Sequence, residues 1–178
     1  MERRGPFGLW KGMSLDDFGT ELVEIAPYKY RTDTPPKAHS AFDFYVVQIS
    51  PTSGLAWIKA IGKNISTNGF GTEVLTAFNS MESKLSATYG RTKKTDMLLQ
   101  GSIWNEPREW MQALQKRERL LFSNWEFKTG AKLGDGISSV FLGATAVDTE
   151  TGYISIEYSF DNFAQSESEI GAAEDDAL

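Results

Sequence analysis

The segment from Ile137 to Phe163 constrains the fold of this chain more than any other part of the sequence. In its second half, polar residues alternate with the apolar residues Ile154, Ile156, Tyr158 and Phe160. A period of two residues indicates a β-strand with one buried face. The Gly-containing stretch Asp148–Gly152 comes before this strand and predicts a turn between antiparallel neighbours. We therefore expect a β-hairpin near the C-terminal end of the chain.

Other strands are predicted in the first half of the chain. The segments Phe42–Ile49 and Leu55–Ile61 are rich in β-branched and aromatic residues, and the turn Ser50–Gly54 between them indicates a second hairpin. We expect a further short strand at Phe7–Trp10. We also expect a Pro-rich loop from Tyr28 to Ser40, whereas residues 95–103 fit either a strand or a loop.

Three helices are expected from apolar residues at helical spacing. The first starts at Ser14, which forms a capping-box pattern with Asp17, and it ends before Pro27. The second runs from about residue 69 to Gly90. The third runs from about Glu106 to Phe122 and has a proline in its first turn.

This order of elements predicts an α+β fold, because strands come in adjacent hairpins instead of alternating with helices. We expect an antiparallel sheet of about five or six strands, with two or three helices packed mainly on one face. At 178 residues the chain fits one domain, which we place at residues 1–163.

The last 15 residues, 164–178, differ from the rest in composition. They contain five acidic residues and no basic one, so they hold five of the six net negative charges of the chain. A small, polar and acidic segment has little to bury, and we expect it to be a disordered tail. Such a tail could attract a basic partner, which makes Glu174, Asp175 and Asp176 candidate binding residues.

Composition argues against several classes of function. The chain has no cysteine, which excludes disulfides, thiol nucleophiles and Cys-based metal sites. Its one histidine, His39, lies in the loop-like stretch TPPKAHS, where we expect a solvated side chain and not a catalytic base. We therefore expect no catalytic residue, no metal and no cofactor.

Nucleic acid and membranes are not expected as partners. The net charge is −6, and the basic residues Lys93, Lys94, Lys116, Arg117 and Arg119 are interleaved with acidic ones or lie in a loop. Apolar runs are only a few residues long, too short to cross a bilayer. The N-terminal residues lack the apolar core of a secretory signal, so we expect a cytoplasmic protein.

Two tryptophans flank a pair of acidic residues around the start of the third predicted helix, and the four residues are Trp104, Glu106, Glu109 and Trp110. Paired carboxylates beside aromatic rings are typical of carbohydrate sites, where one acid donates a proton and the other attacks or activates water. The same residues also fit a structural role, because acidic residues stabilise a helix start and tryptophans anchor a helix to a sheet.

The sequence therefore leaves three hypotheses for function. The first is a non-catalytic protein-binding module that neutralises a basic partner, as inhibitors and immunity proteins of bacteria or phages do. The second is a carbohydrate-binding or hydrolase-like protein that uses Glu106 and Glu109 with Trp104 and Trp110. The third is a structural protein that forms a homo-oligomer through a sheet edge.

Overall fold

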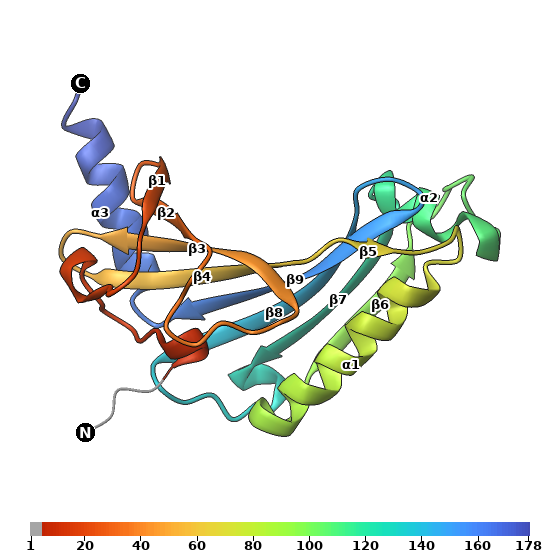
Figure 1. Ribbon diagram of the computed structural model, residues 1–178, viewed down its shortest axis with the longest axis horizontal. Coiled ribbons are helices and arrows are strands. Elements are labelled where there is room, and N and C mark those ends of the chain that lie inside the picture. The colour runs from red at the N-terminus through yellow and green to blue at the C-terminus, as the bar shows by residue number, and fades with distance from the viewer. Residues whose placement is uncertain (1–4) are drawn as a thin grey trace. The chain divides into compact units, whose positions relative to one another are not determined.

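The computed structural model describes residues 5–178, which form an α+β fold with one antiparallel sheet (Figure 1). Within these residues the helices are α1 (Thr72–Tyr89), α2 (Trp110–Gln115) and α3 (Phe163–Asp175). The strands are β1 (Val23–Ala26), β2 (Lys29–Thr32), β3 (Phe42–Ser50), β4 (Gly54–Gly62), β5 (Ile65–Ser66), β6 (Lys93–Leu98), β7 (Arg119–Glu126), β8 (Ile137–Ala146) and β9 (Thr151–Phe160). The 3-10 turns of the described part of the chain are η1 (Pro6–Gly8), η2 (Leu15–Asp17), η3 (Pro107–Glu109) and η4 (Phe127–Thr129).

The described strands are ordered β1-β2-β3-β4-β9-β8-β7-β6, and β5 pairs with β9. This confirms the α+β class, but the sheet has nine strands within residues 5–178, where we expected about five or six. The additional strands are short, or they lie in segments that we assigned to helices and loops. No helix of the described residues is long and apolar enough to cross a membrane.

Packing divides the chain into two compact units, which we describe separately. Unit 1 contains residues up to Ala60, Leu133–Val140 and Glu157–Leu178, and unit 2 contains Ile61–Lys132 and Phe141–Ile156.

Unit 1 is built around an aromatic cluster beneath β3. The ring of Phe7, from η1, lies 4.7 Å from that of Tyr45 and 5.8 Å from that of Tyr158. Tyr45 is buried, and burial raises the pKa of its hydroxyl. Leu9 and Met13, from the segment after η1, are also buried. The N-terminal segment therefore contributes core side chains and not the expected strand at Phe7–Trp10.

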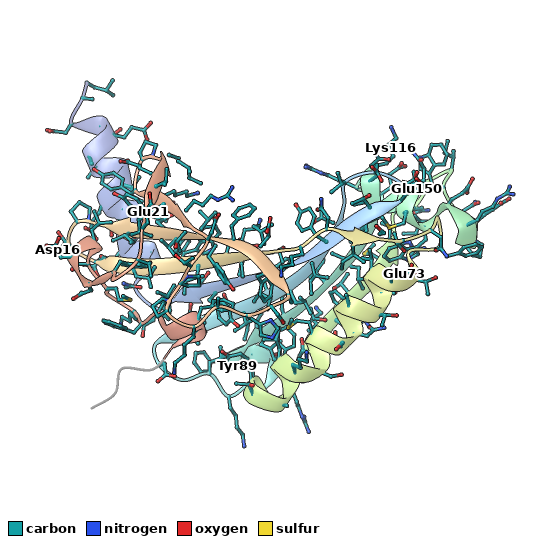
Figure 2. All side chains as sticks on the ribbon, in the orientation of Figure 1. Asp16, Glu21, Glu73, Tyr89, Lys116 and Glu150 are labelled. Atoms are coloured by element: carbon teal, nitrogen blue, oxygen red, sulfur yellow. The ribbon has the colours of Figure 1, made fainter. Side chains whose placement is uncertain are left out.

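In unit 2, helix α1 lies along the sheet beside β6 and β7 (Figure 1). Its buried residues, at helical spacing, are Val74, Phe78, Met81 and Leu85, which confirms the predicted stripe. Figure 2 labels Glu73 at the start of α1, where its carboxylate accepts a hydrogen bond from the hydroxyl of Thr67 at 2.6 Å. This contact lowers the pKa of Glu73.

The prediction of a helix that starts at Ser14 and ends before Pro27 is wrong. The capping box between Ser14 and Asp17 does form, since the Ser14 N–H donates to the Asp17 carboxylate at 2.9 Å. However, only the single turn η2 follows, and the chain then enters β1. Val23 and Ile25 are β-branched and two residues apart, which favours a strand over a helix. Strand β2 likewise occupies part of the segment that we expected to be a loop.

The third predicted helix is much shorter than expected. Helix α2 ends at Gln115, and Arg117 then takes a φ of +58°, in the left-handed region that ends the helix. The following residues, which we assigned to the same helix, form β7 instead. Every second residue of β7 is buried from Leu121 to Trp125, but the middle one is Ser123, so the apolar period of two is interrupted in the sequence.

The C-terminal hairpin is present, with β8 and β9 joined by a turn at residues 147–150. Ile154, Ile156, Tyr158 and Phe160 are all buried, as the alternation predicts. Val140 and Leu142 are buried on β8, and the ring of Phe141 stacks on that of Phe122 at 5.3 Å.

Candidate functional site

The structure places most of the C-terminal segment, which its composition led us to expect as a disordered tail, in a helix. Residues 163–175 form helix α3, which packs against β3 in unit 1. Its one buried side chain is Ser166, whose hydroxyl accepts a hydrogen bond from the amide of Gln48 at 3.2 Å. The same amide donates to the carboxylate of Glu167 at 2.8 Å. Polar contacts therefore hold a helix that has little apolar surface to bury.

Glu169 makes the densest set of these contacts, which we call the Glu169 clasp. Its carboxylate accepts hydrogen bonds from the backbone N–H groups of Thr52 at 2.8 Å and of Ser53 at 3.0 Å. The hydroxyls of Ser53 and Ser50 also donate to it. Hydrogen bonds that favour the charged form, first among them that from Ser53, lower the pKa of Glu169. The turn between β3 and β4 thus binds a carboxylate of the same chain.

A groove of about 500 Å³ separates α3 from the β1–β2 hairpin, and we call it the hairpin groove. Its residues are Ala26, Pro27, Tyr28 and Lys29 on the hairpin and Ile170, Ala173 and Glu174 on α3. Figure 1 shows α3 beside this hairpin. Most of these side chains are apolar or aromatic, and one charged residue lies on each wall. This composition suits an apolar anchor with a charged neighbour.

Acidic side chains extend from the groove to the end of the chain. Glu174, Asp175 and Asp176 are exposed, and within the described residues their carboxylates have no ion pair or hydrogen bond. Glu167 and Glu169 of the same helix are occupied by the contacts described above. The structure therefore leaves the three candidate residues exposed to solvent.

The hairpin also exposes apolar surface beside the groove. Val23 and Ile25 of β1 are 55% and 54% exposed. On β2, the ammonium of Lys29 lies 5.3 Å from the ring of Trp57, and the guanidinium of Arg31 lies 3.9 Å from the ring of Phe44. Cation–π contacts of this kind hold the long side chains against the sheet. The hairpin is thus partly preorganised.

The four residues of the carbohydrate hypothesis lie in unit 2, around η3 and α2. Glu109 accepts a hydrogen bond from the N–H of Glu106 at 3.1 Å, and Glu106 pairs with Arg108 at 2.7 Å. Trp110 is 8% exposed and packs on Gly71, whereas Trp104 is half-buried. In this arrangement Glu109 caps a helix start and Trp110 belongs to the core. The sugar hypothesis stays a prediction.

His39 has a structural role in its loop. Its Nδ1 accepts a hydrogen bond from the backbone N–H of Ala41 at 3.1 Å, and the backbone N–H of His39 donates to the hydroxyl of Tyr45 at 2.9 Å. The imidazole ring lies 5.6 Å from that of Phe42. The side chain is thus half-buried and bonded to its own turn, in contrast to the solvated loop residue that we expected.

Sequence reasoning missed the hairpin side of the groove, because we assigned Tyr28 and Lys29 to a loop. One signal was present: Lys29–Thr32 follows a Pro-Tyr turn and precedes another proline-rich stretch, which is typical of a short strand. Nothing in the local sequence indicates that the groove lies beside α3, since the two walls are far apart along the chain.

A comparison with protein-family models, curated proteins and solved structures found no match for this chain. Among the described residues, no three His, Cys, Asp or Glu side chains are grouped to hold a metal ion.

Proposed function

We propose that this chain is a non-catalytic protein-binding module that contacts a basic partner through the hairpin groove and the acidic end of α3. The observation that carries this proposal is an apolar groove of about 500 Å³ that is lined by Glu174, which the exposed Asp175 and Asp176 follow along the chain. A partner with an apolar side chain flanked by lysine or arginine is complementary to this surface in shape and charge.

The two parts of the surface have different roles in this proposal. Apolar and aromatic side chains that fill a desolvated groove supply most of the binding energy. Exposed carboxylates mainly steer the encounter, so their removal lowers the association rate and weakens its dependence on salt. A protein that masks a basic surface in this way can act as an inhibitor or an immunity-type protein of a cytoplasmic partner.

We propose that the partner is a different protein and not a second copy of the chain. The edge strands of the described sheet are β1 and β6. Strand β1 is four residues long and its pairing shifts register between Glu24 and Ala26, while β6 begins with Lys93 and Lys94. Short, irregular and lysine-bearing edges oppose pairing with another sheet.

The proposal can be tested with a displayed library of short random peptides selected on the intact protein. We expect enrichment of peptides in which an apolar or aromatic residue adjoins Lys or Arg. Ala173→Arg fills the groove and is expected to abolish their binding. Ala172→Arg, on the same helix but outside the groove, is the matched control and is expected to retain it.

Two results would contradict the proposal. The first is that selection enriches no peptide, or only acidic ones. The second is that the enriched peptides bind the Ala173→Arg and Ala172→Arg variants equally well. Light scattering of the unmodified protein at several concentrations provides a separate check, since a dimer that forms in the micromolar range would favour self-association instead.

A further inference from the structure

Helix α3 is attached to unit 1 in a way that allows it to detach without unfolding the rest of the unit. It contributes no strand to the sheet. Of its side chains, only Ser166 is buried. Its detachment therefore exposes no buried apolar side chain of the helix itself, and the polar groups that it leaves behind can bind water.

The contacts that hold α3 are concentrated at two points. Four donors converge on the carboxylate of Glu169 in the clasp, and the amide of Gln48 bridges Ser166 and Glu167. The residue before the helix is anchored independently, because the amide of Asn162 donates to the carbonyl groups of Ser53 at 3.0 Å and Leu55 at 3.1 Å. This arrangement places a hinge at Asn162. The hydrogen bonds that hold the helix, which we call the fastening, lie one to two helical turns beyond it.

The fastening also controls one wall of the hairpin groove. Ile170 and Ala173, which line the groove, lie within about one turn after Glu169 on the same helix. The segment is 13 residues long, and isolated helices of this length are marginally stable in water. A detached α3 therefore loses its helical structure, and the groove loses that wall.

We propose that α3 is a latch that assembles the hairpin groove, with Glu169 as the positioning residue that keeps it closed. This inference rests on the proposed function, because it concerns the regulation of the same surface. A partner that contacts both walls binds only the closed form. Partner binding and closure of the latch are then linked, so each stabilises the other by the same factor.

Amide hydrogen exchange of the intact protein, followed by NMR, tests the latch without any partner. Glu169→Gln replaces one acceptor oxygen with an NH₂ group that faces the donors of the clasp. We expect the amides of α3 to exchange about tenfold faster or more in this variant, with no change in the amides of β3 and β9. Glu174→Gln makes the same charge change on the same helix, where the carboxylate has no hydrogen bond, and is expected to leave α3 exchange unchanged.

A peptide selected on the groove tests the linkage. If only the closed form binds, a peptide at about 100 times its Kd slows the exchange of α3 amides about a hundredfold. The latch is refuted if Glu169→Gln and Glu174→Gln give equal exchange in α3, or if the bound peptide leaves that exchange unchanged. Failure to select any peptide would refute the proposed function instead, and the comparison of the two variants would still decide whether the latch exists.

Discussion

The side-chain amide of Gln48 donates a hydrogen bond to the hydroxyl of Ser166, 3.2 Å away, and both side chains are almost wholly buried. Gln48 lies near the end of strand β3, and Ser166 lies in helix α3, 118 positions later. Buried polar groups are stable only while they are paired. This pair therefore fixes where α3 meets the sheet, although it contributes little to the hydrophobic core.

Substitutions at this pair are expected to be coupled. Gln48→Leu leaves the Ser166 hydroxyl buried without its donor and should lower the free energy of unfolding by about 1–3 kcal/mol. Ser166→Ala removes one contact, but Gln48 keeps its bond to Glu167, so we expect a loss of about 1 kcal/mol. Urea denaturation of both variants and the double variant checks this. Additive losses would show that the two side chains do not stabilise each other.

A second prediction concerns the start of α1, where Gly71 has a φ of +66°. A Cβ at this position would lie 2.2 Å from the ring of Trp110, so an alanine meets both backbone strain and a clash with the core. We expect Gly71→Ala to lower the free energy of unfolding by about 2–5 kcal/mol.

Gly101 provides the matched control, because it has a φ of +87° but a Cβ added there would have no neighbouring atom within 4 Å. Gly101→Ala should therefore cost only the backbone strain, about 1–2 kcal/mol. Thermal unfolding of the two variants separates strain from overpacking. If both variants lose the same free energy of unfolding, the ring of Trp110 moves away from the new methyl group without cost.

The sequence predicted those elements that have long apolar patterns or runs. Helix α1 and strand β9 bury residues at a regular period, and strands β3 and β4 have long apolar runs between turn residues. Prediction failed where a local signal was brief or interrupted. The capping box at Ser14 is real but leads into a single turn, and the buried Ser123 conceals the strand period of β7.

The candidate site was predicted only in part, for a different physical reason. The acidic residues of α3 are visible in the sequence, but their composition predicts disorder because the segment has little to bury. What orders it is the contact between Glu169 and the turn at Ser53, which are 116 positions apart. A local pattern holds no information on such a contact.

A third prediction separates the structural role of Glu109 from the carbohydrate hypothesis. Its carboxylate accepts a hydrogen bond from the N–H of Glu106 at a helix start. A glutamine oxygen can accept the same bond, so Glu109→Gln should change the free energy of unfolding by less than about 0.5 kcal/mol, whereas Glu109→Ala should cost about 1 kcal/mol. Calorimetric titration with sugars provides the other readout. Sugar binding that is lost in the glutamine variant would favour the carbohydrate hypothesis over a capping role.

The last prediction concerns pH, and it follows from the lowered pKa of Glu169. The ordinary pKa of a glutamate is near 4.5, and hydrogen bonds from the β3–β4 turn favour the charged form. The clasp therefore contributes its full stability at any pH above the ordinary pKa of glutamate. This contribution is lost as the pH falls through the lowered pKa of Glu169. Protonation of the Glu169 carboxylate adds a hydrogen that faces the N–H donors of Thr52 and Ser53, which weakens the clasp. Helix α3 should therefore detach in acid before the strands of unit 1 unfold.

Other carboxylates near the latch must be distinguished from Glu169 in this experiment. Glu167 lies on the same helix and binds Gln48, Asp161 precedes the helix and pairs with Lys11, and Asp16 lies with Ser50 in a neighbouring depression. We expect the amides of Thr52 and Ser53 to show an acid transition by NMR that is absent in Glu169→Gln and retained in Glu174→Gln. Because the glutamine variant has no charge to lose at this position, persistence of the same transition would assign it to one of the neighbouring carboxylates.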